Sequence, residues 1–187
     1  PLEKTGAGTL TLSGMNSYTG TTTISEGTLI ASGGSAIADI GLVTVVSGAN
    51  FELATSETVG NLSGAGDVEL NANTLTTGGA NTNSEFSGVI SGTGGLVKTG
   101  TGIMNLQGVS TYTGPTDVTG GNLRVVGTGA LASTDLETTA GGILSSDGGA
   151  LALAAVVTNA GGFNLIGGGD ESIAAVNGAG TVFLSGG

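Results

Sequence analysis

The feature that most constrains this chain is an internal repeat: residues 2–38 and residues 96–132 carry closely similar sequences at an offset of 94 residues. The two segments align without gaps, and 16 of their 37 positions are identical. Other positions exchange one apolar residue for another, such as Ile24 for Val118 and Ile37 for Leu131. Shared composition does not produce such agreement, so we interpret the two segments as copies of one structural unit.

Glycine, leucine, threonine, one lysine and one tyrosine dominate the identical positions. In the first copy they include Lys4, Gly6, Gly8, Leu12, Gly14, Tyr18, Thr19, Gly20, Gly27 and Leu29. In the second copy they include Lys98, Gly100, Gly102, Leu106, Gly108, Tyr112, Thr113, Gly114, Gly121 and Leu123. We predict that these are structural residues, with the glycines at the corners of a coil, where the backbone needs a positive φ or a close approach.

Short strands are indicated along the whole chain. Gly-x-Gly followed by alternating apolar residues occurs at residues 6–12, 64–70 and 178–184, and this period of two is typical of a strand with one buried face. Further alternating runs, bounded by turn-forming residues, lie at 28–30, 43–45, 51–53, 123–125, 151–153 and 163–165. The best helix candidate, residues 150–157, lacks a polar face and fits a strand as well. The sequence therefore predicts an all-β chain.

A solenoid suits these short strands because successive turns stack similar small side chains in a narrow interior, and only six aromatic residues are present. We predict a single-stranded parallel β-helix, right-handed like most parallel connections, with about eight turns of about 20 to 25 residues. Two tandem antiparallel sandwich domains remain the alternative. We expect one β-helix fragment over 1–187, built of two long repeats (2–95 and 96–187) and uncapped at both ends. Since the chain opens with Pro1, we expect a piece of a longer precursor.

The residue types that are missing exclude several kinds of site. The chain has no His and no Cys, so the usual zinc ligands, a Ser-His-Asp triad, a Cys-His dyad and disulfides are excluded. Three basic residues against 14 acidic ones, a net charge of -11, argue against binding to nucleic acid or anionic lipid. No apolar stretch is long enough for a transmembrane helix, so no membrane insertion is predicted. We expect no enzyme activity, no cofactor and no metal.

The remaining polar residues have mainly structural interpretations. We predict that the acids lie on a solvated face, since none shows a complete lyase, hydrolase or calcium-binding pattern; they are Glu52, Glu57, Asp67, Glu69, Glu85 and the pair Asp170 and Glu171. Lys4 and Lys98 read as solubility devices at a strand edge. Each tyrosine is expected to cover the interior at a corner, with its hydroxyl bonded to backbone. The threonines at 19–23 are interpreted as outward hydroxyl ladders. The polar stretch 71–87 is interpreted as a surface loop or a decorated turn that would carry any partner contact.

The repeated text resembles the autotransporter-associated β-strand repeat, also called the passenger-associated transport repeat. Its pattern, LxKxGxGxLxLxG, then NxYTGxTxI, then GxLxxxG, is carried by the identical positions above, completed in the first copy by Leu2, Leu10, Asn16, Thr22 and Ile24. The second copy departs from the pattern at Ser110, in place of Asn, and at Pro115, which suits a turn.

The resemblance implies a right-handed β-helix from a bacterial type V passenger, exported through an outer-membrane β-barrel translocator to the cell surface or secreted. Neighbouring turns of the same passenger would be its other partners. We expect a non-enzymatic stalk module that aids secretion. The alternative is an adhesin that uses the flank of the β-helix to bind a host surface protein or glycan.

Overall fold

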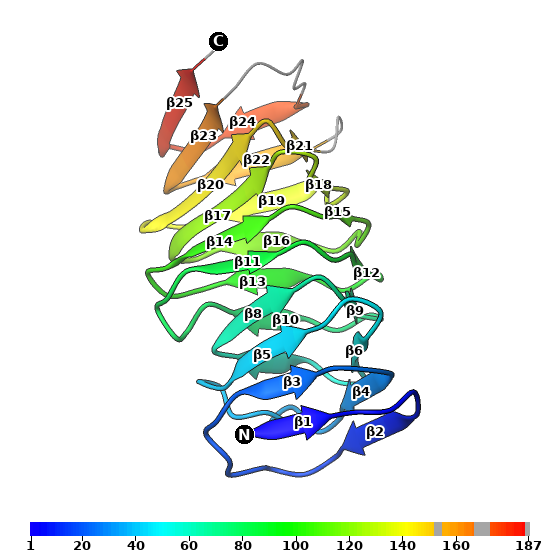
Figure 1. Cartoon of the computed structure of the whole chain (residues 1–187). Helices are drawn as coiled ribbons and strands as arrows, with labels where there is room; N and C mark the ends of the chain where they lie inside the picture. Colours follow the sequence, from blue (N-terminus) through cyan, green and yellow to red (C-terminus); the bar gives the residue numbers. More distant parts are fainter. Residues whose placement is uncertain (152–154, 167–172, 186–187) are drawn as a thin grey trace.

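The described part of the chain forms a coil of twenty-five short strands. The computed structural model describes residues 1–151, 155–166 and 173–185, and no helix occurs in these ranges. The described part therefore holds no helix that could cross a membrane. Figure 1 shows the strands stacked from the N-terminus at one end of the coil to the C-terminus at the other.

Each turn contributes one strand to each of up to three faces. Sheet A holds ten strands: β1 (Leu2–Lys4), β3 (Thr22–Ile24), β5 (Leu42–Val45), β8 (Asn61–Gly64), β11 (Ser84–Phe86), β14 (Ile103–Leu106), β17 (Gly121–Val126), β20 (Gly142–Asp147), β23 (Gly162–Ile166) and β25 (Thr181–Ser185). Sheet C holds seven: β7 (Glu57–Val59), β10 (Leu75–Thr77), β13 (Leu96–Lys98), β16 (Thr116–Val118), β19 (Asp135–Thr138), β22 (Val156–Asn159) and β24 (Ala175–Asn177).

The third face is divided into two shorter sheets. Sheet B holds β2 (Thr9–Leu12), β4 (Thr28–Ala31), β6 (Asn50–Leu53), β9 (Asp67–Glu69) and β12 (Ile90–Ser91). Sheet D holds β15 (Val109–Ser110), β18 (Ala130–Leu131) and β21 (Ala150–Leu151).

The register shows a short and regular turn. Leu2 pairs with Thr22 and Thr22 with Val43, so partners on neighbouring turns are 20 and 21 residues apart. The ten strands of sheet A come from successive turns, which gives about nine turns rather than the predicted eight, because each turn lies at the short end of the expected range.

All pairings between these strands are parallel, as the β-helix prediction requires. A single antiparallel bridge, between Val126 and Gly148, lies outside the strand ladders of the described residues. In Figure 1 the strands of sheet A run from left to right at the front, and the chain returns behind them as it rises, so the coil is right-handed. The alternative of tandem antiparallel sandwiches is wrong.

The core is a set of columns of apolar side chains inside the coil. In sheet B the register stacks Leu29, Phe51, Val68 and Ile90 on successive turns, and all four are fully buried. Alternation along each strand sends these side chains inward and their neighbours outward. Each buried side chain contributes about 1.5–3 kcal/mol, so a long row of medium-sized residues replaces a bulky aromatic core.

Two local predictions need correction or restriction. Residues 71–87 are not one surface loop: they contain β10 and β11, whose Leu75 and Phe86 are buried. The inward positions of these strands also hold Thr77 and Ser84, so the polar sequence hides the alternation of inward and outward side chains. The helix candidate at 150–157 is strand at both of its described ends, in β21 and β22, and residues 152–154 lie outside the described part.

The parallel register also places like charges side by side. On sheet C, Asp117 pairs directly with Glu137, and Asp135 lies two residues before Glu137 on the same strand. Burial raises the pKa of Asp117, and the charges of Glu137 and Asp135 raise it further. Since like charges directly opposite one another in a sheet destabilise it, this part of sheet C carries an electrostatic cost at neutral pH.

We expect Glu137→Gln to stabilise the protein by about 0.5 kcal/mol at about pH 7 and to have no such effect at about pH 3. Asp117 has a raised pKa in the folded state, so its contribution to stability is complete below its unfolded pKa and is lost as the pH rises through the folded value. Urea unfolding at both pH values measures the effect. Glu85→Gln, on an exposed residue opposite Asn105, is the control and should change little. Equal stabilisation at both pH values would contradict the electrostatic origin.

Candidate functional site

The two repeats build the same local structure on different faces of the coil. In the first repeat β1 and β3 lie in sheet A, whereas their equivalents in the second repeat, β13 and β16, lie in sheet C. The offset of 94 residues is not a whole number of turns, so the second copy is rotated relative to the first. The side-chain contacts are nevertheless conserved between the copies, which indicates that the repeat is a local unit of two adjacent turns.

A lysine held by backbone carbonyl groups is the centre of this unit, which we call the lysine cage. The Nζ atom of Lys4 donates to the carbonyl oxygens of Thr5 at 3.0 Å, Gly6 at 2.6 Å and Glu26 at 2.9 Å. Glu26 belongs to the next turn, so the lysine joins two turns at one corner.

The second copy reproduces this lysine cage. The Nζ atom of Lys98 donates to the carbonyl oxygens of Thr99 at 2.6 Å and Gly120 at 3.2 Å. Thr99 and Gly120 stand 94 residues after Thr5 and Glu26, so they are the equivalent positions. Two of the three carbonyl positions are thus used again, although the residue at one of them has changed from Glu to Gly.

The prediction that these lysines are exposed solubility devices is wrong. Lys4 is 6% exposed and Lys98 is 1% exposed. In the described part of the chain the one ion pair is Arg124 with Asp147, so neither lysine has a carboxylate partner. Burial lowers the pKa of Lys98. The side chain is drawn in because the corner carries carbonyl groups that need donors, and an unpaired buried carbonyl is costly.

Glycine allows the next turn to approach this corner. Gly27 has a φ of 65°, and a Cβ atom on it would collide with the carbonyl oxygens of Gly6 and Gly8 on the turn below. Gly121 has a φ of 63° and would meet Gly100 and Gly102 in the same way. Both the left-handed backbone and the close approach require glycine here.

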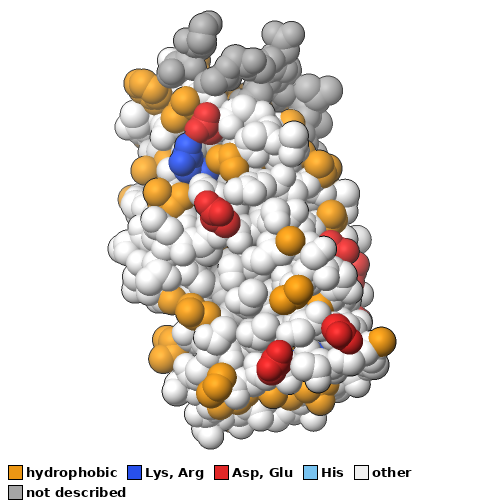
Figure 2. All heavy atoms as spheres, viewed as in Figure 1, with side chains coloured by type: hydrophobic (Ala, Val, Ile, Leu, Met, Phe, Trp, Pro, Cys, Tyr) orange, Lys and Arg blue, Asp and Glu red, His pale blue; other side chains and the backbone are white. Residues whose placement is uncertain are grey.

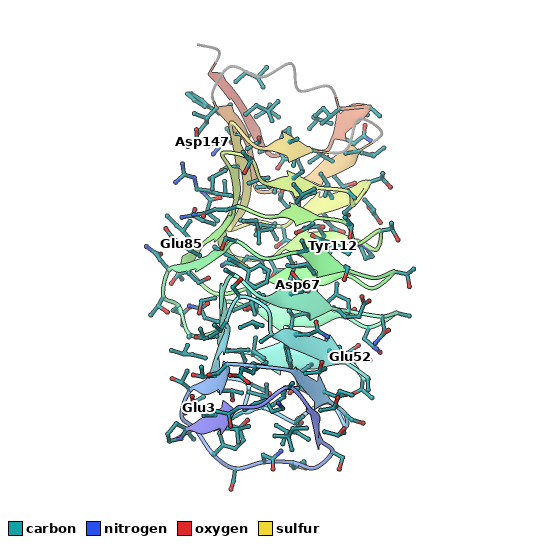
Figure 3. All side chains as sticks on the ribbon, turned by 45° about the vertical axis from the view of Figure 1, so that its right-hand side comes forward. Glu3, Glu52, Asp67, Glu85, Tyr112 and Asp147 are labelled. Carbon is teal, nitrogen blue, oxygen red and sulfur yellow. The ribbon has the colours of Figure 1, made fainter. Side chains whose placement is uncertain are left out.

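Each tyrosine forms a second link, which we call the tyrosine clamp. The hydroxyl of Tyr112 lies 2.7 Å from Oγ1 of Thr116, and both residues are fully buried. The hydroxyl of Tyr18 lies 2.9 Å from Oγ1 of Thr22, in a partly exposed position. Burial raises the pKa of the Tyr112 hydroxyl. Figure 3 labels Tyr112 among the strands of the middle turns.

The predicted position of the tyrosines at corners of the coil is right, but the predicted hydrogen-bond partner of their hydroxyl groups is wrong. Tyr112 does fill the interior at a corner, but both hydroxyls bond to a threonine side chain rather than to backbone. This also corrects the prediction for residues 19–23, since Thr22 is fully buried as a clamp partner while Thr19 is exposed. The spacing Tyr-x-x-x-Thr, shared by both copies, was the available sequence signal.

The other motif residues are divided between core and corner. Leu29, Leu106 and Leu123 are buried, and Leu12 packs against the core from a partly exposed position. Thr113 is exposed and donates its backbone N–H to Gly92 on the turn below. The remaining glycines lie in or beside the turns that separate the strands: Gly14, Gly20, Gly108 and Gly114.

The motif position that is Asn in the first copy and Ser in the second makes different hydrogen bonds in the two copies. Asn16 donates from Nδ2 to the carbonyl oxygens of Gly14 at 3.1 Å and of Ala36 on the next turn at 2.8 Å. Ser110, at the equivalent place, is 1% exposed, and its hydroxyl has no hydrogen-bond partner. The first copy therefore holds an extra link between turns that the second copy lacks.

The acidic residues occupy different environments. Glu57 is 2% exposed, which contradicts its predicted place on a solvated face: its carboxylate accepts from the backbone N–H groups of Ile37 at 2.9 Å and Ala36 at 3.2 Å. The segment around Ala36 forms no strand to bond with sheet C, so a side chain supplies the acceptors. Burial raises the pKa of Glu57.

The other acids lie at the surface. Glu52 and Glu69 are neighbours on sheet B, and both accept hydrogen bonds from Asn71. Asp67 and Glu85 are exposed. Figure 3 shows Glu52 and Asp67 apart from Glu85 and Asp147. The pair Asp170 and Glu171 lies outside the described residues, and within the described ranges no group of three or more acidic side chains could hold a metal ion.

Comparison with known proteins agrees with this geometry. The family model of the passenger-associated transport repeat matches residues 2–31 and 96–125, which are the segments that build the lysine cages and tyrosine clamps. The chain is 41% identical over 127 residues to the adhesin BmaC autotransporter of Brucella suis biovar 1 (strain 1330), an alignment that covers 62% of this chain. It spans 4% of the length of that relative. No solved structure matches the chain.

We expect Lys98→Met to lower the free energy of unfolding by about 1–3 kcal/mol, because the carbonyl groups of Thr99 and Gly120 lose their donor. Methionine keeps the apolar stem, so the loss reports on the ammonium group. Urea unfolding measures it, with Val97→Thr on the outer side of the same strand as a control that should stay within about 0.5 kcal/mol. If Lys98→Met is as stable as the parent, the free-energy cost of burying the ammonium group equals the stabilisation that its hydrogen bonds provide, and the prediction is wrong.

The two tyrosine clamps provide a matched pair of variants. Tyr112→Phe leaves Oγ1 of Thr116 buried without its partner, and we expect a loss of about 1–2 kcal/mol. Tyr18→Phe removes the same bond from a tyrosine that is itself partly exposed, although its partner Thr22 is buried, so we expect a smaller loss. Thermal and urea unfolding of both variants test the comparison. An equal loss at the two sites would show that burial does not set the strength of the clamp.

Proposed function

We propose that the chain, whose residues 2–31 and 96–125 match the passenger-associated transport repeat, acts as a non-enzymatic β-helical stalk that promotes secretion of an autotransporter passenger. In this proposal the chain is one β-helix unit of two long repeats, 2–95 and 96–187, displayed at the cell surface or secreted. Its partners are neighbouring turns of the same passenger and an outer-membrane β-barrel translocator.

One observation carries the proposal: the same lysine cage and tyrosine clamp are built twice, once from strands of sheet A and once from strands of sheet C. A unit that does not depend on which face it occupies is specified by its own two turns. Such a unit can fold before the rest of the coil is present, as expected of a nearest-neighbour repeat protein.

The links within the unit are short in sequence. The lysine cage joins residues that are 22 positions apart, and the tyrosine clamp joins residues 4 positions apart. Contacts that are close in sequence cost little chain entropy and form rapidly. A passenger that emerges from a translocator as an extended chain would therefore gain a folded nucleus as soon as one such unit has emerged.

The composition supports export in this form. The chain has no cysteine, so no disulfide can lock it before translocation, and its net charge of -11 keeps the extended chain soluble. The absence of His and Cys also removes the commonest nucleophile, base and metal ligand types, in keeping with a structural rather than a catalytic role.

Adhesion is the second candidate function, and it is favoured because the Brucella suis relative is an adhesin. Under this alternative the flank of the coil contacts a host surface protein or glycan, while the repeats only maintain the scaffold. The two functions predict different effects of a variant in the repeats. The stalk proposal predicts that less passenger is secreted. The adhesion proposal predicts that the displayed passenger binds its ligand less well.

We expect the double variant Lys98→Met/Tyr112→Phe, placed in the parent passenger, to reduce the amount displayed at the cell surface. The measurement is surface labelling per cell with an antibody to a distal part of the passenger. The matched control is Leu136→Ala, a fully buried residue outside both family matches, whose expected loss of about 2–5 kcal/mol is comparable. A larger drop for the repeat variant supports a secretion role, and equal drops at equal stability would overturn it.

A further inference from the structure

A polar groove lies on the outer face of sheet A, and neither the lysine cages nor the tyrosine clamps use it. It extends over the outward side chains from β5 to β17 and has a volume of about 710 Å³. We call it the sheet A trough. Its floor includes Thr44, Ser63, Glu85, Asn105 and Arg124, which the register places on successive turns.

The residues that line the trough are mostly polar and carry no net charge, although more of the exposed lining surface is apolar than polar. It is mainly hydroxyl and amide groups, together with one carboxylate, Glu85, and one guanidinium, Arg124. Arg124 is also paired with Asp147 just beyond the trough. Figure 2 shows this face as mostly white, with one blue group between red ones. On a chain with a net charge of -11, a neutral groove favours an uncharged occupant.

The centre of the trough offers three planar polar groups in a row. Glu85 pairs with Asn105, and Asn105 pairs with Arg124, so a carboxylate, an amide and a guanidinium follow one another at the strand spacing of about 4.8 Å. The carboxylate accepts hydrogen bonds, the amide both accepts and donates, and the guanidinium donates, all within the length of one or two sugar units. Vicinal hydroxyl groups, each both donor and acceptor, match such a row.

One of these groups lacks a partner. The Oδ1 atom of Asn105 is shielded from solvent and makes no hydrogen bond. A polar atom left in this state costs about 1–3 kcal/mol. A ligand hydroxyl reaches this oxygen only if the Asn105 side chain turns toward the trough, and the hydrogen bond that it then donates would remove this cost.

The walls of the trough are already fixed. Asn61 donates from Nδ2 to the carbonyl oxygen of Thr82 at 2.9 Å and to its Oγ1 at 2.7 Å, and Asn83 accepts the backbone N–H of Ile103 at 2.9 Å. These bonds tie the segment between β10 and β11 to the turns on either side. The apolar side chains of Leu42 and Ile103 complete the lining and can contact the C–H face of a sugar ring. A preorganised groove of this kind lowers the entropy cost of binding.

We propose that the sheet A trough binds an uncharged, extended oligosaccharide, whose successive sugar units follow the ladder of outward side chains. Glu85 accepts from ring hydroxyl groups, Arg124 donates to them, and Asn105 bridges the two. The proposal stands apart from the secretion role, because the trough residues take no part in the lysine cages or the tyrosine clamps.

The test is a titration of the 187-residue chain with cellotetraose and with chitotetraose, followed by backbone amide chemical shifts, with tetragalacturonate as the acidic probe. We expect a Kd of about 1 mM for a neutral sugar, with shifts concentrated at Thr44, Ser63, Glu85 and Asn105. The acidic sugar should bind more weakly, since the surrounding surface is acidic.

Two variants locate the site. Asn105→Ala and the isosteric Glu85→Gln should each weaken binding by about tenfold, the equivalent of one hydrogen bond to a charged or buried group. Thr76→Ala, at an outward position of sheet C, is the matched control and should bind as the parent does. Urea midpoints that are no lower than that of the parent establish that the variants are folded.

Three outcomes would overturn the proposal. The first is the absence of shifts with either neutral sugar at its solubility limit. The second is a set of shifts on sheets B, C or D, or binding that survives both Asn105→Ala and Glu85→Gln. The third is equal or tighter binding of tetragalacturonate. None of these outcomes bears on secretion, so the two proposals fail separately.

Discussion

The whole structure depends on parallel backbone pairing between turns that are only about 20 residues long. Leu2 bonds to the turn that begins near Thr22, and the same step is repeated along sheet A to β25. A short turn leaves room for two or three strands of two to six residues, so each corner must be tight. The tight corners bring carbonyl groups of adjacent turns close together, and this proximity explains both the glycines and the buried lysines. Gly27 and Gly121 allow the approach, and the ammonium groups satisfy the carbonyl oxygens that it brings together.

The lysine cage is unusual because its charge is neutralised by dipoles rather than by an acid. Carbonyl oxygens from two turns surround Lys4, and no carboxylate contacts it within the described part of the chain. This arrangement needs no specific partner side chain, only the backbone of a corner. The change from Glu26 to Gly120 between the copies therefore leaves the lysine cage intact. A salt bridge would have tied the motif to one acidic residue at a fixed place.

The alternation of apolar residues and the internal repeat were sufficient to predict the strands, the parallel coil and most of the core. Leu29, Phe51 and Val68 are buried as a period of two requires, and the family resemblance agrees with the match over residues 2–31 and 96–125. The polar interior was not predictable in this way. Lys98, Glu57 and Thr22 are charged or hydroxylated residues that read as surface, and each is buried because it satisfies backbone or side-chain groups contributed by another turn or corner. Which groups become partners depends on how the turns stack, and the pattern of a single strand does not contain this information.

The trough could not be predicted from the sequence either. Its residues come from turns about 20 positions apart and are brought together only by the strand register.

The rotated placement of the second repeat has a consequence for how proteins of this kind can change in length. Because β1 lies in sheet A and β13 in sheet C, the motif is compatible with two different faces of the coil. An inserted or duplicated segment then need not contain a whole number of turns: the downstream chain continues on a new face and finds equivalent neighbours there. Growth by duplication then requires that each new turn matches the one beside it, and the coil can lengthen by an increment that moves the motif from one of these faces to the other.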